Sequence, residues 1–522
     1  MAAAERRIGG LQRRLAARRG RRSPPRGTEA RGHCGCPDQR PSTMSLVLGA
    51  LASHCLPDPA RVAHAAVPLL APTTRGLLHA DRAGTAPVPD LAAWHAASGD
   101  GATHVFGLRS ATFHDGAPVR ASDVARSFAR LVAPGSTATL GRTLRGLLWR
   151  GGPSRVGDPV EAVMADDARG EVAIRLAAPF GSFAELLAHP SLGIVREGAD
   201  GAVVGCGPLR PIADGQGTWR LVPHGDDAGP RRLRGDLSLR AFATVDALHH
   251  ALQQRIVDAV AIERQHYPRF EAHASTPLRD RWVGAMMLNA GGALQDIGLR
   301  RDFARVVYAV AAAALPASVC TRLLLPEGLA TAAYYDGAGT RLPPPLSARD
   351  FSARWGAMFA SQSLRIVFAP GRGPLTRLLE ALIEELAAAK VPLRVVEEPE
   401  PAGVYALVAQ GAVDVVARGW SQDYDDPEEF FGIYDKQAPG ELAQAPVRRL
   451  CARVSEVRHA SAHERLAVCT EALLEIEAKW LCVPFCRDAN RLFHAPDVRL
   501  SAHARDTFKP EGLVAAESAG LA

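Results

Sequence analysis

Hydrophobic and polar positions in the C-terminal half of the chain follow a pattern typical of an α/β unit. Residues 364–368 form an apolar run that predicts a buried strand. Leucine and isoleucine then recur at helical spacing over 375–386, which predicts a helix with one apolar face. A second strand is predicted at 393–396, and such a unit gives a parallel strand pair with a right-handed crossover. A third apolar run, 413–417, leads directly into the polar segment 418–427, predicted to be a loop.

Shorter apolar runs mark the N-terminal half. Residues 46–50 and 105–109 predict two further strands. Asp115 and Gly116 predict a tight hairpin turn, because glycine readily adopts the positive φ that such a turn requires. A helix is expected next, with Ser122 and Asp123 as candidate N-caps. Its apolar face comprises Val124, Phe128 and Leu131.

Charge is concentrated in one segment of this 522-residue chain, whose net charge is +6. Residues 1–43 hold eleven arginines against three acidic residues, so this segment carries +8 and the remainder about −2. Nucleic-acid binding depends on clustered basic side chains, so a near-neutral body predicts no nucleic-acid partner. No run approaches the roughly 20 apolar residues of a membrane-spanning helix.

The first 43 residues combine arginine, glycine and proline with few bulky apolar side chains, so we expect a disordered tail. No clear export signal follows, because the basic segment leads into Ser23 and Pro24 and not into an apolar run. Residues 44–53, followed by Cys55, weakly suggest a lipoprotein signal but fit a first core strand equally well. Either Met1 or Met44 is a candidate start of translation.

Metal and redox chemistry have weak support. Nine cysteines are scattered without a CxxC pair, which argues against a disulfide framework or a zinc ribbon. The acidic residues between 423 and 429 could bind Mg²⁺ or Ca²⁺, but a solvated or structural loop is the simpler interpretation. We therefore expect no metal site and no cofactor.

Four short segments combine glycine, proline, aromatic and acidic residues in long patterns. They are Phe106 to Val124, with Arg109, Phe113, Asp115, Gly116, Pro118 and Asp123; Gly205 to Pro208; Leu288 to Arg301, with Asn289, Asp296 and Arg300; and Gly419 to Pro427. In this order they resemble the signature of family 5 of the bacterial extracellular solute-binding proteins, the peptide-, dipeptide- and nickel-binding proteins of ABC importers. Cys206 stands where the family has threonine.

The resemblance implies an α/β, bilobal periplasmic-binding-protein-like fold, in the class with an extra third domain and two hinge strands. Lobe I would be discontinuous and comprise residues 44–76, 200–281 and 488–522. The extra domain II would comprise 77–199, and lobe III would comprise 282–487. Two lobes of this kind close over a solute, and a membrane permease recognises the closed form.

The resemblance also implies ligand-binding residues in the segment after 413–417. Asp423 would pair with the α-ammonium of a peptide, and Gly419 and Ser421 would offer backbone hydrogen bonds. A carboxylate in a closing cleft makes a charge-assisted bond that is little screened once water has left. Trp420 would form an apolar wall, and the flanking Arg418 and Tyr424 are further candidate contacts.

No catalytic residue is expected, since no P-loop lysine, GxSxG or HExxH pattern occurs. We therefore expect a monomeric substrate-binding component of an ABC importer, with a short peptide or similar amine-bearing solute as ligand and permease subunits as partners. The resemblance places such a protein in the periplasm or cell envelope. The alternatives are a cytoplasmic ligand sensor with the same fold and an enzyme recruited from it.

Overall fold

The computed structural model describes the greater part of the chain after residue 44. The described residues are 45–52, 58–61, 72–80, 86–134, 136, 138, 140–149, 160–198, 202–214, 218–224, 236–262, 266–325, 344–368, 373–398, 401–421, 426–435, 445–458, 460–500 and 513–515. None of their helices is long and apolar enough to cross a membrane. The predicted disordered tail, 1–43, lies outside these residues.

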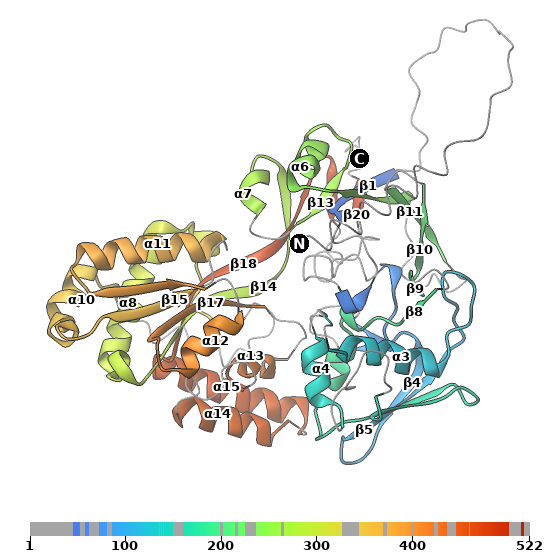
Figure 1. Cartoon of the computed structure of the whole chain (residues 1–522), viewed down its shortest axis with the longest axis horizontal. Helices are drawn as coiled ribbons and strands as arrows, with labels where there is room; N and C mark the ends of the chain where they lie inside the picture. Colours follow the sequence, from blue (N-terminus) through green and yellow to red (C-terminus); the bar gives the residue numbers. More distant parts are fainter. Residues whose placement is uncertain are drawn as a thin grey trace, which may run out of the picture. The chain divides into compact units, whose positions relative to one another are not determined.

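Ten strands form the largest sheet (Figure 1). In sheet order they are β10 (Leu209–Ala213), β11 (Thr218–Pro223), β12 (Asp236–Phe242), β1 (Ser45–Leu51), β13 (Ala259–Ala261), β18 (Cys482–His494), β14 (Ala274–Leu288), β17 (Val415–Ser421), β15 (Leu364–Phe368) and β16 (Leu393–Glu397). The strands predicted from apolar runs at 46–50, 364–368 and 393–396 are confirmed. The run at 413–417 predicted β17, which extends further, so residues 418–421 are strand and not loop.

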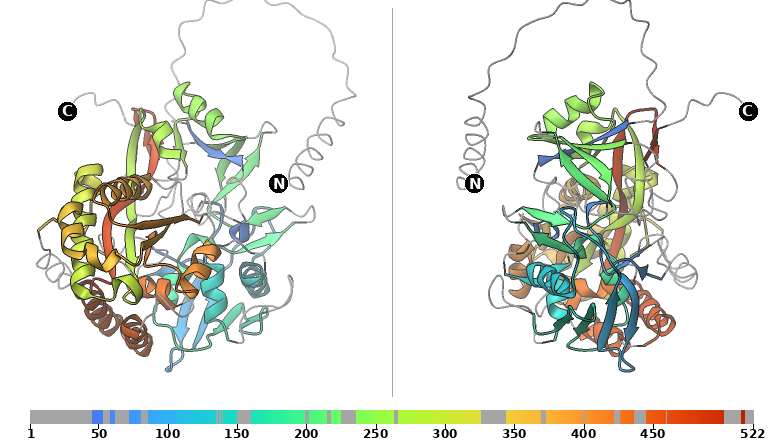
Figure 2. Two further views of the ribbon diagram at one scale, coloured as in Figure 1. Left: turned by 60° about the vertical axis from the view of Figure 1, so that its left-hand side comes forward. Right: turned by 90° about the vertical axis from the view of Figure 1, so that its right-hand side faces the viewer.

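The two longest strands of this sheet, β14 and β18, pair antiparallel along most of their length. The register runs from Ala274↔His494 to Met287↔Cys482, with irregularities near the middle. At one end β18 also pairs with β13, and at the other end β14 pairs with β17. Figure 2 shows the pair side by side, with β14 in yellow-green and β18 in red. These two strands therefore join the two halves of the sheet, as expected of hinge strands.

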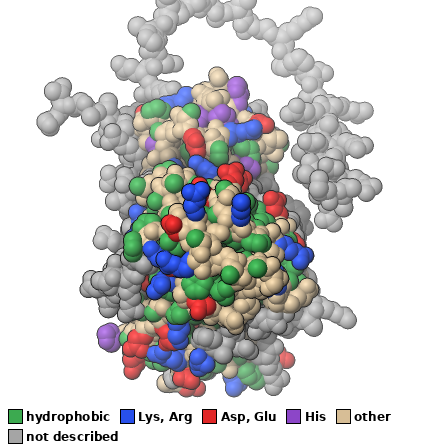
Figure 3. Space-filling model, turned by 90° about the vertical axis from the view of Figure 1, so that its left-hand side faces the viewer, with side chains coloured by type: hydrophobic (Ala, Val, Ile, Leu, Met, Phe, Trp, Pro, Cys, Tyr) green, Lys and Arg blue, Asp and Glu red, His purple; other side chains and the backbone are tan. Residues whose placement is uncertain are grey.

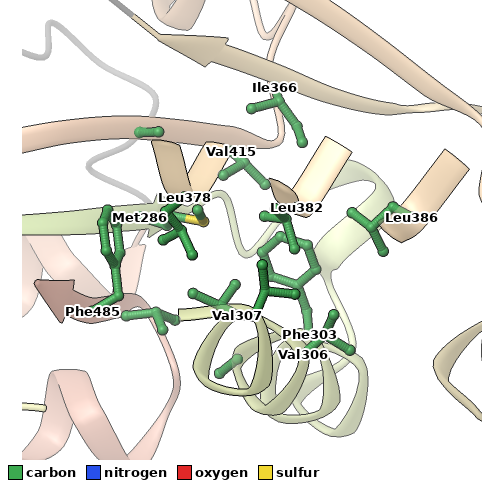
Figure 4. Packing of buried hydrophobic residues seen from close by; sticks show 14 of the residues in the cluster. Met286, Phe303, Val306, Val307, Ile366, Leu378, Leu382, Leu386, Val415 and Phe485 are labelled. Atoms are coloured by element: carbon green, nitrogen blue, oxygen red, sulfur yellow. The ribbon is translucent and has the colours of Figure 1, made fainter. Parts of the chain in front are cut away.

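The predicted α/β unit is present. Strand β15, helix α11 (Gly373–Ala388) and strand β16 follow one another, and the two strands are parallel in the register Leu364↔Leu393. The leucines of α11 pack on α8 (Ile297–Ala314) and on the sheet, because their helical spacing places them on one face. Figure 4 shows this packing, with Leu378, Leu382 and Leu386 against Phe303 and Val306.

A separate four-stranded sheet lies in the N-terminal half, in the order β4 (Ala92–Ala97), β5 (Thr103–Leu108), β7 (Glu171–Arg175), β6 (Val163–Asp166). Helix α3 (Ala121–Val132) buries Val124, Phe128 and Leu131 against it, as the apolar spacing predicted. The predicted hairpin turn is also confirmed, because Gly116 has a φ of 87°.

The predicted caps of α3 need correction. Arg120 occupies the N-cap position, and Asp123 accepts a hydrogen bond from the Arg120 backbone N–H. Ser122 instead donates its hydroxyl to Asp167 at 2.8 Å. Sequence could identify the start of the helix but not the partner of Ser122, which lies 45 residues away.

The remaining elements are short strands and helices. The strands are β2 (Leu78–His79), β3 (Val88–Pro89), β8 (Val195–Glu197), β9 (Val203–Gly205), β19 (Val498–Leu500) and β20 (Leu513–Ala515). The helices are η2 (Pro59–Arg61), α4 (Gly141–Leu147), α5 (Phe183–Leu187), η4 (Pro190–Leu192), α6 (Val245–Gln253), α7 (Tyr267–Phe270), η6 (Gly292–Leu294), η7 (Ala317–Val319), α10 (Ala348–Trp355), η8 (Gly356–Phe359), α12 (Pro401–Ala409), α13 (Glu428–Asp435), α14 (Ala445–Glu456) and α15 (Ala462–Ala478). The fold is mixed α/β, as predicted. The boundaries proposed at 76, 199, 281 and 487 stay predictions.

A buried ion pair fixes the start of β17. Asp414, fully buried, accepts two hydrogen bonds from the Arg365 guanidinium, at 2.9 and 2.8 Å, and a third from the Arg365 backbone N–H. Asn289, directly after β14, donates its side-chain amide to the carbonyl of Val413 at 3.1 Å. Strands β14, β15 and β17 are thereby tied together at one edge of the sheet.

We predict that Asp414→Asn lowers the free energy of unfolding by about 2 kcal/mol or more, because the substitution leaves the Arg365 guanidinium without its charged partner. Chemical denaturation followed by circular dichroism measures this change. The matched control is Glu471→Gln, which removes a carboxylate from the exposed pair with Arg453 and should change stability by less than about 1 kcal/mol. Equal effects of the two substitutions would contradict the anchoring role of Asp414.

Candidate functional site

Strand β17 extends at its C-terminal end beyond its described pairing with β15. It pairs with β14 as far as Trp282↔Ser421. On its other side, within the part of the chain that the structure describes, pairing with β15 reaches only Phe368↔Ala417. From residue 418 to 421 the strand therefore has one neighbouring strand among the described residues.

Glycine is required at two neighbouring positions of this sheet by the indole of Trp282. A Cβ at Gly419 would lie 1.9 Å from two carbon atoms of that ring, and a Cβ at Gly284 would lie 2.8 Å from it. Gly284 and Gly419 are direct partners in the β14 and β17 register. Trp282 is only 3% exposed, so its ring fills the space that both glycines leave. No local pattern in the sequence marks Trp282 or Gly284, although the family-like motif contains Gly419.

The structure places four of the six predicted ligand-binding residues in this strand end. Arg418 is half-buried, and Gly419 lies under the Trp282 ring. Trp420 and Ser421 are placed by their backbone, opposite Val283 and Trp282 of β14. Asp423 and Tyr424 lie outside the described residues. The role of all six in ligand binding stays a prediction.

The chain resumes at Asp426, three residues after Asp423, in a buried polar cluster. Asp426 caps the start of α13 by accepting a hydrogen bond from the Glu428 backbone N–H at 2.8 Å. Its other oxygen accepts the Ser182 hydroxyl at 2.6 Å and the Arg465 guanidinium at 2.9 Å. Ser182 and Asp426 are both buried and 244 positions apart in the chain.

Glu428 extends this cluster. Its carboxylate accepts a hydrogen bond from Arg458 at 2.5 Å, and the Arg458 carbonyl accepts one from the Gly181 N–H. Burial raises the pKa of Glu428 to about 7, although the Arg458 charge opposes this shift. Treating the acidic run after Asp423 as a solvated loop is therefore wrong for Asp426 and Glu428. Sequence could not reveal their burial, because the partners lie on distant segments.

Other residues of the family-like motifs support the fold. Asp115 pairs with Arg196, and Asp296 caps α8 by accepting the Leu299 N–H at 2.8 Å. A Cβ at Gly205 or Gly207 would lie within 2.3 Å of the Thr73 backbone, so only glycine fits there. Among the described residues, no group of three or more His, Cys, Asp or Glu side chains could hold a metal ion.

We predict that Gly419→Ala lowers the free energy of unfolding by about 1–3 kcal/mol, because the added methyl group displaces the buried Trp282 ring. Gly99→Ala is the matched control, since a Cβ at Gly99 meets no atom within 4 Å. Thermal and chemical denaturation compare the two variants. A Gly419→Ala protein as stable as the Gly99→Ala protein would show that the ring moves without cost.

We also predict a pH dependence from Glu428. Its pKa of about 7 in the folded protein lies above its ordinary value of 4.5, so folding favours the protonated form. The contribution to stability is therefore complete below about pH 4.5, is lost as pH rises toward 7, and amounts to about 3 kcal/mol at most. Glu428→Gln should flatten the decline in unfolding free energy between pH 5 and pH 8. Glu197→Gln, at an exposed carboxylate, should leave that decline intact.

Comparison with known proteins agrees with this fold. The model of "Bacterial extracellular solute-binding proteins, family 5 Middle" matches residues 86–301. No curated protein matches the sequence.

Solved structures of binding proteins are similar over nearly the whole chain. The "Clavulanic acid biosynthesis oligopeptide binding protein 2" has a TM-score of 0.68 at 20% identity, covering 91% of this chain and 96% of that one. NikA from Brucella suis in complex with Fe(III)-EDTA has 0.68 at 16%, covering 90% and 100%. DppA from Helicobacter pylori in complex with peptide STSA has 0.63 at 16%, covering 91% and 98%. The expected bilobal fold is thus confirmed, and residues 86–301 are similar to family 5 of the bacterial extracellular solute-binding proteins.

Proposed function

We propose that the chain is the substrate-binding component of an ABC importer and captures a short peptide, or a similar amine-bearing solute, between its lobes. The ligand would then be presented to the permease subunits of the importer. The protein would act as a monomer in the periplasm or cell envelope and would not be an enzyme. Members of family 5 and the structural neighbours of this chain are binding proteins, which supports this class of function.

One observation carries the choice of a peptide: β17 continues through residues 418–421 beyond its described pairing with β15, as a strand that could pair with a ligand would. An extended peptide can continue a sheet at such an edge, because its backbone N–H and C=O groups pair in the same way whatever its side chains. Main-chain pairing supplies affinity without selecting a sequence. The edge therefore favours a receptor that accepts many short peptides.

The position of Asp423 supports an amine at one end of that peptide. Asp423 follows the strand edge by two residues, and Asp426 begins the anchored cluster three residues later. A peptide running along 418–421 would have one terminus near the end of β17, and Asp423 follows that end by two residues in sequence. A carboxylate there can hold an α-ammonium with a charge-assisted hydrogen bond.

The neighbours' ligands are consistent with a peptide but do not fix one. DppA from Helicobacter pylori was solved with the peptide STSA, and OppA from Haemophilus influenzae with RPPGFSPFR. NikA from Brucella suis holds Fe(III)-EDTA, which has no peptide backbone.

On the face in Figure 3, basic and acidic side chains are interspersed, without the continuous basic patch that would favour nucleic acid.

We predict that Asp423→Asn weakens peptide binding at least 100-fold, because the cost of an unpaired buried charge is about 3–5 kcal/mol. The ligand is first identified by mass spectrometry of the native complex. Calorimetry then compares that peptide with its N-acetylated form, which lacks the α-ammonium. The native protein should discriminate strongly against the acetylated peptide, and the Asp423→Asn protein should not.

Asp425→Asn is the matched control, because it removes a neighbouring carboxylate and should leave both affinities unchanged. Thermal denaturation of each unliganded variant tests for a purely structural role. A lowered melting temperature with unchanged affinity in Asp423→Asn would make Asp423 a cap and not a ligand contact. Purification without any bound peptide, and no binding of a library of di- to pentapeptides, would end the proposal of a peptide receptor.

A further inference from the structure

Two cysteines lie opposite each other across a pair of extended segments. Cys320, directly after η7, forms an isolated antiparallel bridge with Cys486 of β18. The flanking hydrogen bond runs from the Thr321 N–H to the Phe485 carbonyl at 3.2 Å. Both cysteines are thiols in this structure. In sequence they are 166 positions apart, so spacing alone could not pair them.

This hydrogen bond defines the type of pair. It joins the residue after Cys320 to the residue before Cys486, so the two cysteines form a non-hydrogen-bonded pair of the antiparallel pattern. Such residues have their Cα atoms about 4.5 Å apart and their side chains on the same face. A disulfide requires Cα atoms roughly 4.4–6.8 Å apart, so the backbone already meets this requirement.

The surroundings of the two thiols are also compatible with a disulfide between them. Both side chains belong to one hydrophobic cluster, in which Cys486 is fully buried and Cys320 partly exposed. The Cys320 thiol donates weakly to the carbonyls of Ala311 and Pro316, each at 3.6 Å. The Cys486 sulfur lies 2.5 Å from the position that a Cβ of Gly284 would occupy. The missing side chain of Gly284 leaves the Cys486 sulfur room on this face.

We propose that Cys320 and Cys486 are a disulfide-forming pair, oxidised by thiol–disulfide exchange with a small or protein disulfide. The Cys320 thiolate, at the accessible end, attacks the oxidant disulfide and releases one thiolate of the oxidant. The Cys486 thiolate then attacks the Cys320 sulfur and releases the second. The protein loses two protons and two electrons, and the oxidant disulfide is reduced to two thiols.

The bond would fasten the segment after α8 to β18. Cys486 pairs with Gly284, and Gly284 pairs with Gly419, so the bond would lie in the same row across the sheet as the strand edge of the candidate site. Burial raises the pKa of Cys320, so the thiolate is scarce at neutral pH and oxidation should accelerate about tenfold per pH unit. Disulfides persist in oxidising compartments, so the bond would be maintained in an exported form of the protein.

The test uses the full chain, purified reduced and then incubated with oxidised glutathione at pH 8. After alkylation, a tryptic digest without reductant should contain peptide 306–322 linked to peptide 480–487. Fragmentation distinguishes Cys486 from Cys482 within the second peptide. Oxidation should raise the melting temperature by at least about 3 °C, because the bond closes a long loop in the unfolded chain.

Cys320→Ser should abolish both the linked peptide and the rise in melting temperature. Cys206→Ser is the matched control, because Cys206 is buried in a different hydrophobic cluster, and it should retain both effects. A digest without this linkage, or with Cys320 linked to any other cysteine, would overturn the proposal. A correct linkage that leaves the melting temperature unchanged would overturn the fastening role. None of these outcomes depends on peptide binding.

Discussion

The pairing of β14 with β18 is the interaction on which the large sheet depends. Strands from residues 45–51, 209–261 and 364–421 lie in one sheet only because these two strands run through it together. Each contributes residues to the apolar clusters of the C-terminal half, and β18 also contributes to those beside β1 and β13. Their hydrogen bonds are formed between segments about 200 residues apart, so the sheet cannot be completed until residues 482–494 have been synthesised.

Around the candidate site, rigid anchors stand on both sides of a short connection. Asp414 and Arg365 fix the start of β17, and the Trp282 ring covers its end. Four residues separate Ser421 from Asp426 in the sequence, and the carboxylate of Asp426 is buried. The buried charges of Asp414 and Asp426 are energetically costly, and they lie at the two points where the backbone is held in place. If Asp423 binds the ligand as proposed, its position in sequence between two such anchors would restrict where its carboxylate can lie.

Local patterns in the sequence were sufficient to predict helices, strands and turns. They were insufficient to predict which distant residues contact one another. The strand at 364–368, the leucine-rich face of α11 and the turn at Gly116 follow from spacing and backbone preference, and all are present. The burial of Asp426 and Glu428 depends on Ser182, Arg458 and Arg465, so the composition of the acidic run was misleading. The motif residues indicated the family, but the described ones chiefly cap helices, close turns or permit close backbone contact. Side chains at Asp423 and Tyr424 fall outside the described residues.

The packing of Trp282 on two glycines has a consequence for how such chains diverge. The steric constraint acts on the combined volume at three positions and not on any one of them. A larger residue at 419 keeps the full stability of the fold only if the residue at 282 becomes smaller, so neutral drift there would proceed by paired changes. NikA from Brucella suis, at 16% identity, has a similar fold. The shape of this part of the sheet therefore depends on the combined volume at positions 282, 284 and 419.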